Sequence, residues 1–94
     1  MIETFTCKET KKIWNGQRSA KLPGDIQNRA LRKLRQLDAA ITLEDLRNPP
    51  GNRLEALKGD LQGQYSIRIQ KQWRICFTWN KGSATDVEII DYHA

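Results

Sequence analysis

The feature that most constrains this chain is a change of hydrophobic period at Asn48-Pro49-Pro50-Gly51. Before this break, apolar residues recur every three or four positions, as on one face of an α-helix. After it, apolar and polar residues alternate, as in half-buried β-strands. Because Pro and Gly end regular elements, the break separates a helical half from a strand half. The chain is therefore expected to form an α+β layer, a sheet with helices packed on one face.

The helical half predicts one long helix, one short helix and a final turn. The long helix begins near Asp25 and has an apolar face formed by Ile26, Ala30, Leu34, Leu37 and Ile41. Residues 8–15 fit the short helix, and residues 42–47 add one more turn. Ahead of these, the alternation over residues 2–6 predicts a short strand.

The second half predicts a three-stranded antiparallel meander over residues 64–70, 73–79 and 86–91. A three-residue loop, Gln70-Lys71-Gln72, pairs Ile67 with Ile75 and sets Arg68 opposite Arg74, on the face away from the apolar side chains. Like charges at such positions repel each other. The two arginines therefore either spread into water, pair with acids of the next strand, or hold an anion between them.

The charge of the chain is mildly basic and unevenly distributed. It has 16 Lys and Arg against 11 Asp and Glu, a formal net charge of +5 over 94 residues that form a single domain, 1–94. Nine basic and two acidic residues lie between positions 8 and 35, and five basic and one acidic between 58 and 81. Two basic zones suit a polyanionic partner, although a surface tuned for solubility explains the total charge equally well.

Several classes of protein are disfavoured by what the chain contains. No apolar run approaches the roughly 20 residues of a membrane span, and charges from Glu3 onward interrupt any signal peptide. Cys7, Cys76 and the single histidine, His93, are too few for a disulfide framework or a structural zinc site. Nor does the chain carry a phosphate-binding Gly-rich loop or a Ser or Cys placed beside a base. We therefore expect a cytoplasmic domain with no metal, no cofactor and no membrane partner.

The sequence ends in residues suited to acid–base chemistry, Asp91-Tyr92-His93. His93 can act as general acid or base, Asp91 can orient it, and Tyr92 can stack on a nucleobase. The strand that ends there neighbours the strand carrying Arg74, so these groups can converge on one sheet surface. Together they suit metal-independent transfer of an RNA phosphodiester to its own 2′-hydroxyl. A frayed chain end is the alternative interpretation.

The order and spacing of several sequence blocks resemble the HigB toxins, the plasmid-maintenance branch of the RelE superfamily. The blocks span nearly the whole chain and are Leu54-Glu55-Ala56-Leu57-Lys58-Gly59-Asp60, Tyr65-Ser66-Ile67-Arg68-Ile69, Gln72-Trp73-Arg74-Ile75-Cys76-Phe77 and Asp91-Tyr92-His93. The segments Asn52-Arg53-Leu54-Glu55 and Phe77-Thr78-Trp79 are most similar to the GraT-type toxin of pseudomonads.

This resemblance implies a compact RelE-like toxin of a type II toxin–antitoxin system. Such a toxin enters the A site of the 70S ribosome and cuts mRNA without a metal. The resemblance also implies a cognate helix-turn-helix antitoxin of the HigA or GraA type. Operator DNA is contacted only through that antitoxin.

The resemblance further assigns roles to individual residues. Lys58 and Arg74 match basic positions at the scissile phosphate, and Asp91, Tyr92 and His93 match the C-terminal catalytic group. Glu55 stands where some HigB toxins have a histidine; a carboxylate can serve as general base but repels a phosphate. The residues expected to bind RNA are Lys58, Arg68, Lys71, Arg74, Arg29, Arg32 and Lys33.

The sequence thus predicts a ribosome-dependent mRNA endonuclease restrained by its antitoxin. Three alternatives stay open. In the first, Glu55 marks a degenerate site, and the protein acts by occupying RNA or the ribosome and as co-repressor of its operon. In the second, the protein is a ribonuclease that cuts free RNA without the ribosome. Separately, the cations of the long helix fit an acidic antitoxin surface as well as they fit ribosomal RNA.

Overall fold

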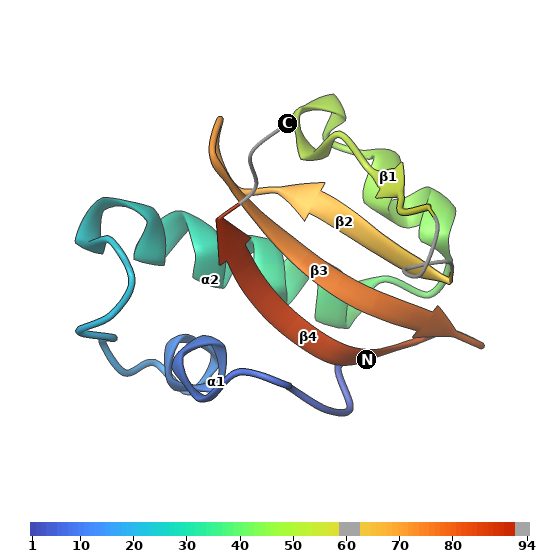
Figure 1. Ribbon diagram of the computed structural model, residues 1–94. Coiled ribbons are helices and arrows are strands. Elements are labelled where there is room, and N and C mark those ends of the chain that lie inside the picture. Colours follow the sequence, from blue (N-terminus) through green and yellow to red (C-terminus); the bar gives the residue numbers. More distant parts are fainter. Residues whose placement is uncertain (59–62, 92–94) are drawn as a thin grey trace.

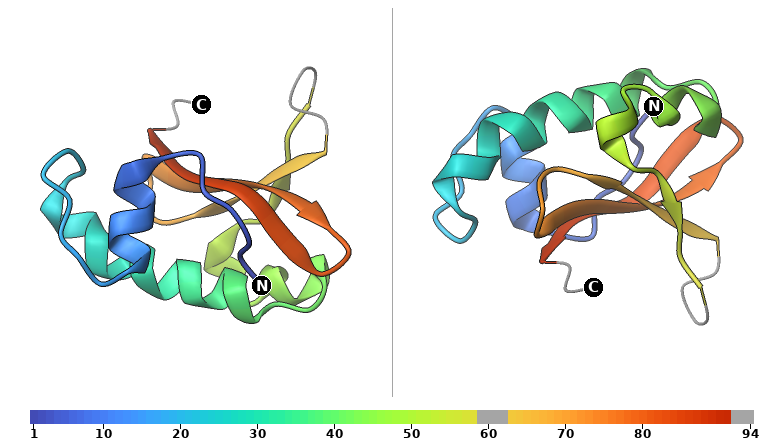
Figure 2. Two further views of the ribbon diagram at one scale, coloured as in Figure 1. Left: turned by 90° about the horizontal axis from the view of Figure 1, so that it is seen from below. Right: turned by 90° about the horizontal axis from the view of Figure 1, so that it is seen from above.

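The computed structural model describes residues 1–58 and 63–91, and this part of the chain contains one four-stranded antiparallel sheet with helices on one face (Figure 1). The strands lie in the order β1 (Glu55–Ala56), β2 (Gln64–Arg68), β3 (Trp73–Asn80) and β4 (Ser83–Asp91). The helices α1 (Lys8–Trp14) and α2 (Gly24–Ala39) cover one side of this sheet (Figure 2). The predicted α+β class is confirmed. None of the described helices is both long and apolar enough to cross a membrane.

The register of the β2–β3 hairpin is the one that the alternation predicts. Ile67 opposes Ile75 and Arg68 opposes Arg74. The N–H of Ile69 donates to the carbonyl of Trp73 at 2.9 Å, which closes the three-residue loop. Because side chains alternate between faces, this register places the apolar residues of both strands toward the helices and the two arginines away from them.

Strand β4 begins three residues earlier than the predicted strand over residues 86–91. Lys81 and Gly82 both have positive φ, 48° and 82°, as in the tight turns that match the twist of a hairpin. Ser83 therefore already pairs with Asn80. The residues at the start of β4 are small or polar, so alternation alone does not reveal them.

Two further segments join the sheet at its edges. Residues 2–6, predicted as a strand, run parallel to β4 and touch it through two isolated bridges, Ile2 to Ala84 and Phe5 to Val87. At the other edge, two short 3-10 helices, η1 (Leu43–Arg47) and η2 (Pro50–Asn52), lead into β1. The two-residue strand β1 pairs with β2 and has no counterpart among the sequence predictions.

The hydrophobic core lies between α2 and the sheet. Its most buried side chains include Ile26, Leu34 and Leu37 from α2, and Ile67, Ile75, Phe77 and Val87 from the sheet. Trp14, Trp73 and Trp79 are partly buried against it. Ile41, expected on the same helical face, is instead 78% exposed. The helix ends at Ala39, and the N–H groups of Ile41 and Thr42 turn away to donate to the Asp45 carboxylate in a capping box.

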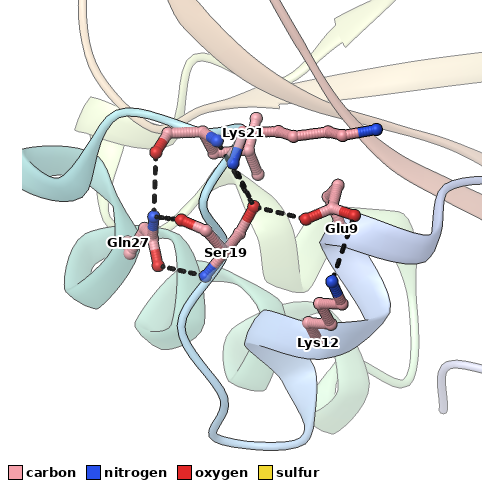
Figure 3. A network of polar contacts seen from close by, with 6 residues as sticks. Glu9, Lys12, Ser19, Lys21 and Gln27 are labelled. Atoms are coloured by element: carbon pink, nitrogen blue, oxygen red, sulfur yellow. Dashed lines mark hydrogen bonds and ion pairs between the residues drawn. The ribbon is translucent and has the colours of Figure 1, made fainter.

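The loop between α1 and α2 is held by side-chain hydrogen bonds (Figure 3). The buried Gln27 accepts a hydrogen bond from the N–H of Ser19 and donates to the carbonyls of Ser19 and Leu22. The hydroxyl of Ser19 donates to Glu9 at 2.6 Å, and this hydrogen bond lowers the pKa of Glu9. Backbone groups that the loop would otherwise leave unpaired are thereby satisfied.

We expect Leu37→Ala to lower the free energy of unfolding by about 2–5 kcal/mol, because it opens a cavity in the core. Ile41→Ala, at the neighbouring position of the predicted face, is expected to change it by less than about 0.5 kcal/mol. Urea denaturation monitored by tryptophan fluorescence measures both values. Equal losses for the two variants would mean that the helical face continues through Ile41.

Candidate functional site

The centre of the candidate site is the buried guanidinium of Arg74 on β3. This side chain lies on the sheet face away from the helices, and only 7% of it is exposed. Its Nε donates to the hydroxyl of Ser66 at 2.8 Å, and its Nη2 donates to the carbonyls of Ser66 and Arg53. A buried charge requires such partners. The arginine is therefore not the freely solvated residue that the alternating pattern allows.

The segment before β1 supplies one of these partners. Arg53 adopts a left-handed conformation with φ 44°, and its carbonyl accepts from Arg74. The preceding Asn52 is fully buried and donates to the carbonyl of Leu46 at 3.1 Å, while its own side-chain oxygen accepts from Lys33. The buried amide thereby links the loop that carries the Arg53 carbonyl to α2.

Sequence reasoning missed Ser66 and Asn52. Both are fully buried, and both make the hydrogen bonds that position Arg74 or its partner. Ser66 lies on the predicted polar face of β2, and a serine there carries no sign of burial. The burial of Ser66 depends on strand β1, which the sequence did not predict. Because Glu55 of β1 pairs with Ser66, β2 is an inner strand at this position.

Glu55 is the carboxylate that the structure brings to Arg74. Its Oε1 lies 3.9 Å from Nη1 of the arginine, and 49% of the glutamate side chain is exposed. The distance is that of an ion pair and is longer than a hydrogen bond. Pairing with an acid of the next strand, β4, was one of the three alternatives for Arg74; the carboxylate that the described residues place within ion-pair distance belongs to β1.

The other predicted catalytic residues lie around this centre. Asp91 ends β4 opposite Trp73, so its side chain faces the other side of the sheet from Arg74, and it accepts a hydrogen bond from Gln72 at 2.9 Å. Lys58 is exposed, two residues beyond β1. Tyr92 and His93 lie outside the described residues. Within the described ranges, no group of three carboxylate, thiol or imidazole side chains gathers to hold a metal ion.

Cys76 lies on the same sheet face as Arg74 but is unsuited to nucleophilic chemistry. Burial raises the pKa of its thiol to about 11; the negative charge of Glu88 adds to the rise, and Arg74 opposes it. The thiolate is the reactive form, so at neutral pH almost none of the nucleophile is present.

A second cationic feature is a groove between α2 and the end of β2, with a volume of about 440 Å³. It is lined by Arg29, Arg32, Lys33, Gln36, Gly51, Arg68, Ile69, Gln70 and Lys71. We call this the basic groove. Among the described residues that line it there is no carboxylate. The structure thus brings together five of the seven residues that were expected to bind RNA, and leaves Lys58 and Arg74 outside.

The cations of the basic groove are close enough to affect one another. Burial, together with the charges of Arg29 and Arg32, lowers the pKa of Lys33. Arg29 donates to the carbonyl of Ile69 at 3.5 Å and so bridges the two walls. A groove of mutually repelling cations gains stability when an anion enters.

We predict that Cys76 in the folded protein resists alkylation. Its raised pKa keeps the thiol protonated at pH 8, so iodoacetamide should modify Cys76 many times more slowly than it does in urea-unfolded protein. Mass spectrometry of tryptic peptides reports the rate at each cysteine. Equal rates in folded and unfolded protein would contradict the assigned environment.

Comparison with known proteins relates this geometry to a family. The sequence profile of the HigB-like toxins, described as RelE-like toxin of type II toxin-antitoxin system HigB, matches residues 3–93. The chain is 50% identical over 72 residues to Toxin HigB-1 of Vibrio cholerae, covering 77% of this chain and 75% of that protein. It is 31% identical over 93 residues to Endoribonuclease HigB of Proteus vulgaris, covering 99% of this chain and 100% of that one.

Solved structures show the same fold at lower identity. A chain of the heterotetrameric YoeB–YefM toxin–antitoxin complex of Staphylococcus aureus superposes with a TM-score of 0.63 at 21% identity, covering 100% of this chain and 97% of that one. The YoeB dimer of the same organism gives a TM-score of 0.57 at 20% identity, covering 99% and 95%. With these matches to the profile, the relatives and the fold, the chain belongs to the HigB-like family of RelE-like toxins of type II toxin–antitoxin systems.

Proposed function

We propose that this toxin is a ribosome-dependent endoribonuclease that cuts mRNA in the cytoplasm at the sheet face carrying Arg74. The observation that carries the proposal is the anchored guanidinium, a fixed positive charge of the kind that stabilises a pentacoordinate phosphorane. The name of the Proteus vulgaris relative, Endoribonuclease HigB, supports the same activity.

The proposed reaction needs no metal. A base removes the proton of the ribose 2′-hydroxyl, and the oxygen attacks the adjacent phosphorus. The bond to the 5′-oxygen breaks, an acid protonates that oxygen, and the products are a 2′,3′-cyclic phosphate and a 5′-hydroxyl. Arg74 and Lys58 stabilise the charge on phosphorus. His93 transfers the proton and Tyr92 orients the nucleotide.

In this scheme Asp91 supports the site from behind the sheet. Its hydrogen bond to Gln72 joins the end of β4 to the β2–β3 turn. This contact ties down the end of β4, from which the chain continues to Tyr92 and His93. We therefore assign Asp91 a positioning role.

The basic groove is proposed to bind RNA phosphates outside the reaction centre. Its five cations, Arg29, Arg32, Lys33, Arg68 and Lys71, face a common volume that no described carboxylate lines. Such contacts add salt-dependent affinity without sequence preference. Arg68 is the cross-strand partner of Arg74, so the groove adjoins the proposed reaction centre around the edge of β2.

The proposed protein partner is a helix-turn-helix antitoxin that neutralises the toxin and carries it to operator DNA. The family is that of type II toxin–antitoxin toxins, and one solved neighbour is a YoeB–YefM complex. An antitoxin with an acidic surface competes with RNA for the basic groove.

A second candidate function is a toxin that binds RNA or the ribosome without cutting. The observation that favours it is Glu55, whose carboxylate lies beside the arginine that would hold the scissile phosphate. Expression of a chain truncated after Asp91 distinguishes the two, because it lacks Tyr92 and His93. Growth arrest by this chain would indicate occupancy, and loss of arrest would indicate cleavage.

We predict that Arg74→Ala and His93→Ala each lower the rate of mRNA cleavage on purified translating ribosomes by at least about tenfold. Arg74→Lys should also lose activity, because an ammonium cannot donate to Ser66 and Arg53 and still reach a phosphate. Primer extension locates the cuts, and the cyclic phosphate end is identified by its resistance to ligation.

The control is Arg47→Ala, which removes an exposed arginine paired with Glu44 on η1 and should leave the rate unchanged. Because Arg74 is buried, the thermal unfolding of each variant is measured alongside. A folded Arg74→Ala variant with full activity would refute the assigned role, and cleavage of free RNA at the same rate would refute ribosome dependence.

The basic groove generates a separate prediction. Replacing Arg29 and Arg32 by Gln should weaken ribosome binding and reduce the slope of log affinity against log salt by about 1–2. The matched control replaces Lys8 and Lys11, exposed cations of α1 outside the groove. If the groove variant binds ribosomes normally but loses its antitoxin, the groove is the antitoxin interface instead.

A further inference from the structure

We infer that Glu55 competes with the substrate phosphate for Arg74, and so limits how tightly the toxin holds RNA, instead of serving as the general base. The inference rests on the proposed function for its biological meaning. The competition itself can be measured with a simple anion and without cleavage. What carries it is the contact of a half-exposed carboxylate with an immobilised guanidinium.

The hydrogen bonds of Arg74 determine which of its nitrogen atoms a phosphate meets. Nε donates to Ser66, and Nη2 donates to the carbonyls of Ser66 and Arg53. These protein oxygens fix the plane of the guanidinium. Nη1 lies 3.9 Å from Oε1 of Glu55, so an anion that approaches the guanidinium at this nitrogen meets the carboxylate. Substrate and glutamate therefore require the same place.

The guanidinium cannot move away to serve both anions. Its anchors are the fully buried Ser66 and the carbonyl of Arg53, the residue after the fully buried Asn52. Glu55 is the mobile partner of the pair, because its side chain is half exposed and its contact is longer than a hydrogen bond. Without a hydrogen bond between its partners, such a pair holds the carboxylate less firmly than a charge-assisted hydrogen bond would. The carboxylate can leave when a phosphate arrives, but its departure reduces the net affinity.

A role as general base conflicts with this position. To act on a bound substrate, the carboxylate would have to stay within a few ångströms of a phosphate held by the same nitrogen. Two negative charges at that separation repel each other, and the burial of Arg74 weakens the screening by water. The arrangement therefore favours exchange of one anion for the other over simultaneous binding.

The experiment is a titration of the full-length toxin with inorganic phosphate, followed by the NMR signal of the Arg74 Nε–H group. That hydrogen is buried and bonded to Ser66, which slows its exchange with water. Glu55→Gln and Glu55→Ala should both bind phosphate about three- to tenfold more tightly than the unchanged protein. The alanine variant is needed because a glutamine amide could itself donate to phosphate.

The matched control is Glu44→Gln, which makes the same change in net charge on η1, where Glu44 pairs with Arg47. Its phosphate affinity should stay within twofold of the unchanged protein. If Glu44→Gln and Glu55→Gln raised the phosphate affinity equally, the effect would come from net charge alone, and the inference would be overturned. Unchanged or weaker binding by the Glu55 variants, or no response of Arg74 to phosphate in any variant, would also overturn it.

Cleavage assays on translating ribosomes separate this inference from the proposed function. If the toxin is not a nuclease, neither the unchanged protein nor Glu55→Ala will cut mRNA, while the difference in phosphate affinity will still be present. If Glu55 is the general base, Glu55→Ala will bind phosphate more tightly or equally but lose cleavage at saturating ribosomes. That loss would overturn the assignment of Glu55 as a competitor alone.

Discussion

The buried charge of Arg74 is the constraint around which the sheet face is built. Removing a guanidinium from water is expensive unless its buried donors find partners. Here the partners are Ser66 on the adjacent strand and the Arg53 carbonyl on the loop before β1. Since Asn52 in that loop is hydrogen-bonded to Lys33 and Gln36 of α2, the position of one cation depends on both layers of the fold.

The elements with a clear hydrophobic period were predictable from the sequence, and those defined by tertiary contacts were not. The apolar spacing in α2 and the alternation in β2 and β3 fix their faces, and the three-residue loop fixes the pairing of Arg68 with Arg74. The end of α2 was misplaced because the capping box at Thr42 redirects Ile41, an effect that periodicity does not include. Strand β1 is too short to show any period.

Of the candidate site, the sequence predicted the residue types but not how the fold brings them together or buries them. The cations of the basic groove could be identified individually as basic residues, but their gathering around one volume depends on how α2 crosses the end of β2. The burial of Arg74 could not be inferred, because a polar residue on an alternating strand is expected in water. Its burial follows from β1, which is too short to show a period, and from the side-chain hydrogen bonds of Asn52, which the hydrophobic pattern does not reveal.

The identity of the central cation follows from this geometry. An arginine offers five N–H donors within one plane, so Nε and Nη2 can donate to three internal acceptors while Nη1 lies within ion-pair distance of a carboxylate. A lysine at the same position would have to choose between the protein and the substrate. The same fixed plane that would pre-organise Arg74 for the proposed phosphate also keeps it beside Glu55. The hydrogen bonds that fix the guanidinium of Arg74 therefore also keep it within reach of the Glu55 carboxylate.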